Sequence, residues 1–98
     1  MPSYIILGNF TKKGIEKIAD APKRDEEARR LIEEAGGSLQ LFYTMGDYDF
    51  VAIMEMPDDE SMLKFLLQTL RGKKVVMKTL KAWTEQEFGE VVSRLEEQ

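Results

Sequence analysis

The 98-residue sequence contains neither cysteine nor histidine. Without cysteine, this chain can form no disulfide, no thiolate nucleophile and no Cys-ligated zinc site. Without histidine, it offers no Ser-His-Asp triad and no imidazole for acid–base chemistry. No other catalytic motif of known mechanism is present, and we expect neither a bound metal nor a cofactor. The sequence therefore leaves open whether the protein is an enzyme.

Long apolar runs and an excess of positive charge are also missing. No segment approaches the roughly 20 apolar residues that span a bilayer, and the N-terminus "MPSYIILGNF" lacks the pattern of a signal peptide. Lys and Arg number 14 against 18 Asp and Glu, so the net charge is −4, and phosphate-neutralising nucleic-acid binders are normally basic. We therefore expect a cytoplasmic protein that binds neither nucleic acid nor membranes. Three short basic clusters are interpreted as solvated surface: Lys23-Arg24, Arg29-Arg30 and Arg71 with Lys73-Lys74.

What is present indicates one globular domain over residues 1–98, since 43% of the residues are hydrophobic and 33% are charged. Hydrophobic periodicity separates the elements. Strands are predicted at Ser3–Phe10, Ser38–Met45, Tyr48–Met56 and Lys73–Trp83. Helices are predicted after Thr11, from Pro22 to the Gly36-Gly37 stop, after the Asp58 cap, and at about residues 84–97, where Thr84 and Glu87 form a capping box.

This order, β-α-β-β-α-β with a C-terminal helix, predicts an α+β, ferredoxin-like fold with a four-stranded antiparallel sheet. Helices should cover one face of that sheet. Both central strands are apolar on both faces, so the second face should also be covered. The C-terminal helix of the same chain is one candidate cover, and a second copy of the chain is the other. We favour a homodimer or larger homo-oligomer formed through this face, which the C-terminal helix could reinforce. The residues assigned to the dimer interface are Tyr4, Ile6, Phe10, Phe50 and Met54.

The stretch Gly46-Asp47-Tyr48-Asp49 is the most distinctive in the chain. Gly46-Asp47 is predicted to be a two-residue hairpin turn with glycine first. Asp47 and Asp49 could together bind a hard cation or act as an acid/base pair. The alternative is that Asp47 only forms the turn and Asp49 caps backbone or pairs with a lysine. Tyr48 is expected to point toward the dimer face, as a packing aromatic rather than a catalytic acid.

A second candidate site lies at the predicted start of the helix after Pro22. Lys23 and Arg24, with the free N–H groups of the first turn, could hold a phosphate or a carboxylate. The acids that follow them argue against such a site. Thr11 and Tyr43 are further candidates for lining a ligand pocket.

Five landmarks in order make the chain resemble the GYD-domain family of small bacterial and archaeal proteins. They are Phe10-Thr11 with Gly14, Pro22-Lys23-Arg24, Gly46-Asp47-Tyr48-Asp49, Pro57-Asp58-Asp59, and Thr79 to Thr84. The resemblance covers the chain to about Glu87. It implies a ferredoxin-like domain of the dimeric α+β-barrel type, and it implies little about activity, because the family is uncharacterised.

Two functions remain open at this point. The first is a non-catalytic module for assembly or regulation, which we favour. The second is a small-molecule-binding or enzymatic domain with a mainly apolar pocket near the sheet or the dimer interface. In that case Tyr48, Asp49, Lys23 and Arg24 would orient the ligand.

Overall fold

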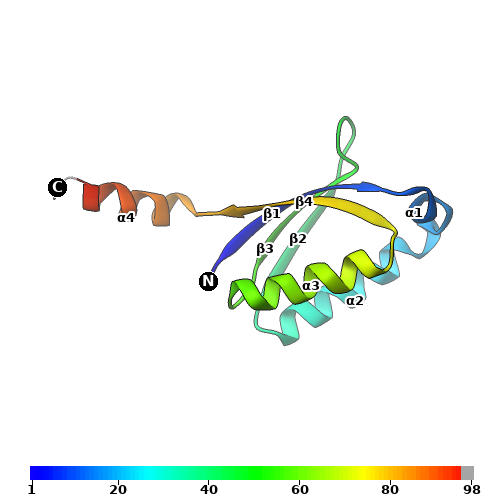
Figure 1. Ribbon diagram of the computed structural model, residues 1–98, viewed down its shortest axis with the longest axis horizontal. Helices are drawn as coiled ribbons and strands as arrows, with labels where there is room; N and C mark the ends of the chain where they lie inside the picture. The colour runs from blue at the N-terminus through cyan, green and yellow to red at the C-terminus, as the bar shows by residue number, and fades with distance from the viewer. Residues whose placement is uncertain (96–98) are drawn as a thin grey trace.

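The computed structural model describes residues 1–95, so the predicted helix end at residue 97 lies outside them. The sheet and the helices packed on it form the body of the molecule, and the last helix projects from it (Figure 1). The elements along the chain are β1 (Ser3–Phe10), α1 (Lys12–Glu16), the 3-10 helix η1 (Ile18–Asp20), α2 (Ala21–Glu34), β2 (Ser38–Tyr43), β3 (Phe50–Glu55), α3 (Asp59–Arg71), β4 (Val75–Ala82) and α4 (Glu85–Leu95).

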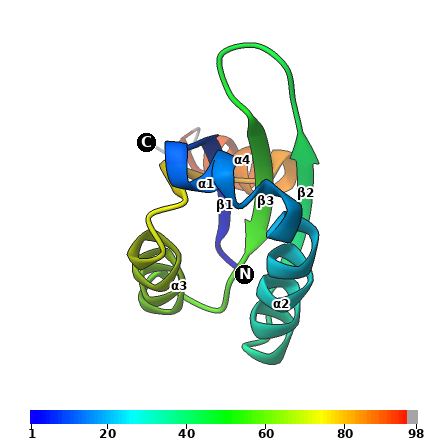
Figure 2. The ribbon, with the colours of Figure 1, turned by 90° about the vertical axis from the view of Figure 1, so that its right-hand side faces the viewer.

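The four strands form one antiparallel sheet in the order β2-β3-β1-β4. Helices α2 and α3 lie on the same face of this sheet, one over each half, as the two views in Figures 1 and 2 show. This arrangement confirms the predicted α+β, ferredoxin-like fold. The opposite face carries no helix of the body.

The helix boundaries follow from local signals in the sequence. Thr11 caps α1, since its hydroxyl accepts a hydrogen bond from the Gly14 amide at 3.1 Å. The Asp58 carboxylate caps α3 by accepting from the Ser61 amide at 2.7 Å. Gly36, just past the end of α2, has a φ of 93°, the left-handed backbone that ends many helices. These predicted signals are confirmed.

The hairpin between β2 and β3 differs from the prediction. Its loop is six residues long, 44–49, rather than two, because β2 ends at Tyr43 and β3 begins at Phe50. Gly46 still takes a positive φ of 116° at the tip, and the Thr44 amide donates to the Asp49 carbonyl at 2.9 Å. The loop projects beyond the sheet (Figure 2).

The structure also corrects the assignment of the two sheet faces. The residues assigned to the dimer interface lie on the helix-covered face: Tyr4, Ile6, Phe50 and Met54 are core residues and Phe10 packs against them. Alternation in β1 and β3 is apolar on both sides, so it does not distinguish the faces, and the helices α2 and α3 decide between them. The core consists of Tyr4, Ile6, Ile32, Phe50, Ala52, Met54, Met56 and Met62.

The molecule exposes more surface than its mass requires. Its accessible surface is 7192 Å² for 11.3 kDa, whereas a compact monomer of that mass exposes about 5,700 Å². The radius of gyration is 15.4 Å, against about 12.6 Å for a compact domain of this length. The projecting α4 accounts for much of this elongation (Figure 1).

Candidate functional site

The loop that carries Gly46-Asp47-Tyr48-Asp49 joins β3 to β1 through Asp49. The Asp49 carboxylate accepts a hydrogen bond from the Phe10 amide at 2.9 Å. The Asp49 amide donates to the Gly8 carbonyl at 2.9 Å and to the Asn9 side chain at 3.1 Å. Regular pairing of β1 with β3 ends at Gly8 and Phe50. Beyond this point the Asp49 carboxylate, rather than a β3 carbonyl, accepts the hydrogen bond of the β1 backbone. This is the backbone-capping role considered for Asp49 in the sequence analysis.

Tyr48 leaves the loop on the side of the sheet opposite to α2 and α3. The Lys78 ammonium lies 5.8 Å from the centre of its ring and 3.5 Å from its hydroxyl. Lys78 pairs across the sheet with Leu7, whose side chain alternates with the core residues of β1. Tyr48 and the Asp49 carboxylate therefore serve different parts of the structure and do not form one site.

The uncovered side of the sheet, which we call the open face, is apolar along the middle of its two central strands. Directly paired residues share a face, so the register places Ile5 with Ile53 and Leu80 in one row and Leu7 with Val51 and Phe42 in the next. Ile53 and Leu80 remain 42% and 49% exposed. The members of the open face are Ile5, Leu7, Phe42, Val51, Ile53, Val76 and Leu80, with Gln40, Tyr48, Glu55 and Lys78 at its margins.

Helix α4 is a second uncovered apolar surface. Thr84 and Glu87 form the predicted capping box, with side chain to amide distances of 2.8 and 3.1 Å. The helix extends away from the sheet and the other helices (Figure 1). Trp83 and Phe88 are 62% and 65% exposed. The apolar side chains of this segment are Trp83, Phe88, Val91, Val92 and Leu95, and all are exposed.

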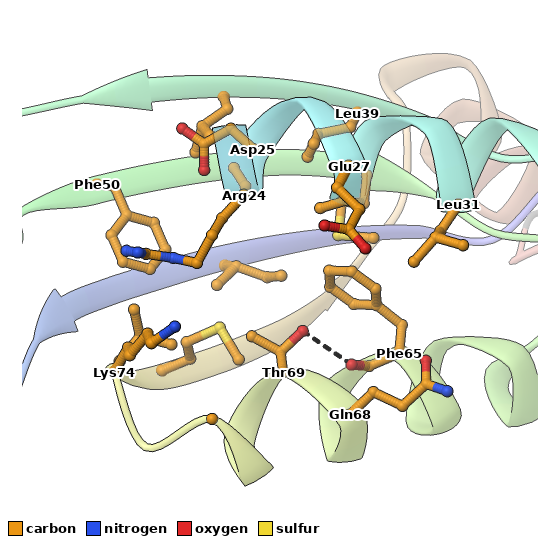
Figure 3. A pocket seen from close by; sticks show the side chains of 18 of the residues that line it. Arg24, Asp25, Glu27, Leu31, Leu39, Phe50, Phe65, Gln68, Thr69 and Lys74 are labelled. Atoms are coloured by element: carbon orange, nitrogen blue, oxygen red, sulfur yellow. Dashed lines mark hydrogen bonds between the residues drawn. The ribbon is translucent and has the colours of Figure 1, made fainter. Parts of the chain in front are cut away.

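A cavity of about 340 Å³ lies between α2, α3 and the helix-covered face of the sheet. Its floor is formed by side chains of the central strands, among them Ile6, Ala52 and Met54. Leu31 of α2 and Phe65 of α3 face one another across it (Figure 3). Cavities of this size and composition are typical of small-ligand sites.

Charged side chains gather at one end of this cavity, near Phe50. Arg24 from the first turn of α2 and Lys74 from the segment before β4 both reach this end (Figure 3). The Arg24 guanidinium also donates to the Lys17 carbonyl at 3.1 Å. The Tyr43 hydroxyl donates a hydrogen bond to the Asp25 carboxylate, and the Tyr43 ring stacks on that of Phe10 with centroids 6.1 Å apart.

The six residues proposed from the sequence as ligand-binding do not meet at one place. Arg24 and Tyr43 line the cavity. Thr11 caps α1 and also donates to the Lys73 carbonyl at 2.7 Å, so its hydroxyl holds backbone together. Lys23 is exposed and is not among the cavity residues. Tyr48 and Asp49 lie in the loop described above.

Sequence reasoning missed a cluster that joins α3 to the sheet. The buried Tyr4 donates from its hydroxyl to Asp59 at 2.5 Å, and the Lys81 ammonium contacts the same carboxylate at 2.8 Å. Hydrogen bonds from Lys81, and then from Tyr4, lower the pKa of Asp59. Burial of the Tyr4 side chain raises its pKa to about 12, and the hydrogen bond to Asp59 is the second cause of this shift. The three residues are 22 to 77 positions apart in the chain, so no local spacing could have signalled the cluster.

Hydrogen bonds to aspartate carboxylates indicate structural roles for both Tyr4 and Tyr43. Burial and the hydrogen bond to Asp25 also raise the pKa of Tyr43. Tyr4 and Tyr43 therefore stay protonated at neutral pH and donate hydrogen bonds.

Within residues 1–95, no three Asp or Glu side chains come together in an arrangement that could hold a metal ion. None of the helices in that range is long and apolar enough to cross a membrane.

The chain belongs to the GYD domain family, whose sequence model matches residues 4–92. One curated relative, from Thermus thermophilus, is 29% identical over 84 residues, which are 84% of this chain and 88% of the relative. That protein is named glutamine synthetase and cystathionine beta-lyase binding protein. No solved structure matches the chain with statistical significance.

Proposed function

We propose that this protein is a homo-oligomeric protein-interaction module that binds metabolic enzymes and has no catalytic activity of its own. The observation that supports this most is the open face, an apolar sheet surface that no element of the body covers. Soluble monomers rarely leave a contiguous apolar surface of this kind exposed. A second copy of the same chain, packed sheet to sheet about a two-fold axis, would cover it.

The size of the open face suggests that α4 belongs to the same interface. Four strands about 4.8 Å apart and six residues at about 3.3 Å give a planar area of roughly 400 Å². A standard interface buries about 800 Å² on each partner. The exposed apolar side chains of α4 can supply the difference by packing on the second copy. The excess of accessible surface over a compact monomer, about 1,500 Å² per chain, is compatible with that extent of burial.

The enzyme-binding part of the proposal is supported by the curated relative. Its name states that it binds glutamine synthetase and cystathionine beta-lyase, and the alignment covers most of both chains. We infer that the present protein also binds one or more enzymes of amino-acid metabolism. Such partners agree with the cytoplasmic location that we expect.

The oligomer can be tested by light scattering after size exclusion. The wild type should elute as a dimer or a larger species at micromolar concentration. Ile53→Glu should raise the dissociation constant by at least about 30-fold, because the two-fold axis buries one carboxylate from each copy at a cost of at least about 1 kcal/mol each. Leu63→Glu is the matched control, since Leu63 is an exposed apolar residue on the outer side of α3.

A monomeric wild type, or equal effects of Ile53→Glu and Leu63→Glu, would contradict the dimer. Enzyme binding needs a separate measurement. Immobilised protein should bind purified glutamine synthetase or cystathionine beta-lyase from the same source in surface plasmon resonance, and an unrelated enzyme of similar charge should not bind. If neither enzyme binds, the partner part of the proposal is wrong whatever the oligomeric state.

A further inference from the structure

We propose that the cavity between α2, α3 and the sheet binds an apolar monocarboxylate. The tail would lie along Ile6 and Ala52, and Arg24 and Lys74 would hold the carboxylate. This site is on the opposite face of the sheet from the proposed dimer interface, so it adds a ligand to the protein-binding role.

The cavity is suited to a small apolar molecule. Its volume of about 340 Å³ lies at the lower end of the range for ligand pockets. The floor carries Ile6, Ala52 and Met54 of the central strands. The walls carry Leu31 of α2 and Phe65 of α3. These apolar side chains favour an alkyl or aryl group over a polar one.

The charged side chains at the Phe50 end of the cavity determine which head group the ligand can carry. Among the described residues, neither Arg24 nor Lys74 takes part in a salt bridge. Arg24 uses one nitrogen for the Lys17 carbonyl, which orients the guanidinium and leaves its other N–H groups for a ligand. The nearby Asp25 accepts the Tyr43 hydroxyl. The Asp25 carboxylate lines the same end, so the two cations, which come from separate segments, leave one net positive charge there, and this matches a single ligand carboxylate.

Glu27 determines the direction of the ligand and excludes a second acid. Its carboxylate lies farther along the cavity, close to Phe65 and away from the Arg24 end (Figure 3). A ligand carboxylate near Glu27 would meet a like charge. The head group is therefore placed at Arg24 and Lys74, and a dicarboxylate that reached both ends would be repelled.

Titration calorimetry with straight-chain carboxylates tests the site on the wild-type protein. Octanoate should bind with one molecule per chain. Affinity should rise about fourfold for each methylene from butanoate to octanoate, the factor expected for burying one methylene. Octanol, which has the same tail without the charge, should bind at least tenfold more weakly. No binding of any of these carboxylates at millimolar concentration would overturn the proposal, as would equal binding of octanol.

Variants test the head-group contacts. Arg24→Ala should weaken octanoate binding at least tenfold, and Lys74→Ala should act in the same direction. Lys23→Ala is the matched control, because Lys23 is adjacent in sequence yet does not line the cavity. Glu27→Gln should leave binding unchanged or tighten it. Equal losses from Arg24→Ala and Lys23→Ala, or weaker binding by Glu27→Gln, would contradict a monocarboxylate held at this end.

The methionine methyl groups report where the probe binds. Met54 and Met77 line the cavity, whereas Met45 lies in the β2–β3 loop and is fully exposed. In a methyl NMR spectrum, octanoate should shift the Met54 and Met77 signals and leave that of Met45 unchanged. Binding without shifts of Met54 and Met77 would place the probe elsewhere and refute the site.

Discussion

Replacing Asp49 by alanine tests whether the acidic motif is structural or chemical. The Asp49 carboxylate is the acceptor for the Phe10 amide, at 2.9 Å in a partly buried position. Alanine would leave that amide without an acceptor, which costs about 1–3 kcal/mol. The free energy of unfolding should fall by this amount. For a domain of this size the midpoint of thermal unfolding should fall by at least about 4–8 °C.

A graded series makes this prediction sharper. Asp49→Asn keeps an oxygen acceptor and loses only the charge, so it should lose about half as much stability, because charge-assisted hydrogen bonds are roughly twice as strong as neutral ones. Asp47→Ala, two positions away in the exposed loop, should change stability by less than about 0.5 kcal/mol.

The assay is urea unfolding followed by circular dichroism, with all variants at one protein concentration because an oligomer makes the midpoint concentration-dependent. The slope with urea should stay the same in all variants, so that the midpoint alone reports stability. Equal stability of Asp49→Ala and the wild type would refute the backbone-capping role. Equal losses from Asp47→Ala and Asp49→Ala would show that the effect comes from acidic charge in the loop rather than from this hydrogen bond.

Three further predictions concern packing and pH. Gly14→Ala should destabilise the protein by about 1–3 kcal/mol or more, since the added methyl would stand 2.1 Å from the Lys74 carbonyl oxygen. Gly89→Ala, in open space on α4, should instead raise helix content, as measured by circular dichroism. Because Lys81 lowers the pKa of Asp59 below its usual 3.8, Asp59 adds stability above pH 3.8 that is lost as the pH falls further. The stability difference between wild type and Asp59→Asn should therefore shrink below pH 4, in urea unfolding at several pH values.

Elements with local chemical signals could be predicted well from the sequence. The Thr11, Asp58 and Thr84 caps act between a side chain and an amide three residues away, so the sequence contains both partners in order. The hairpin loop differs from the prediction because Gly46-Asp47 is a short-loop signal, whereas Asp49 bonds the Phe10 amide with its side chain and β3 begins only at Phe50. That contact spans 39 positions and has no local signal.

The two faces of the sheet could not be distinguished from β1 and β3 alone. Their alternate residues are apolar on both sides, and the deciding evidence is which side α2 and α3 cover. The alternation in β2 is the better indicator of which sheet face is buried. Ser38 and Gln40 lie on one side of this strand, and Leu39 and Leu41 lie on the other. The pairing of Leu41 with Ala52 puts the more apolar side of this edge strand on the core face. The register depends on long-range pairing, so this signal is usable only once the sheet is known.

The candidate cavity depends on the same long-range information. The sequence offers Lys23-Arg24 both as solvated surface and as an anion site, whereas Lys73-Lys74 is interpreted as solvated surface alone. The fold brings Arg24 from the first cluster and Lys74 from the second to one end of the cavity, while Lys23 stays outside. Arg24 lines the cavity and Lys23 does not because the two residues lie on different sides of α2. The sequence alone does not say which side of α2 faces α3.

The proposed interface and the proposed ligand site can be tested independently because they use alternate residues of the same strands. Ile5 and Ile53 face the open side, whereas Ile6 and Ala52 face the cavity. Ile53→Glu should therefore weaken the dimer and leave octanoate binding intact, and Arg24→Ala should do the reverse. If either variant abolishes both properties while the protein remains folded, the two faces are coupled through the strands they share, and ligand occupancy would then regulate assembly.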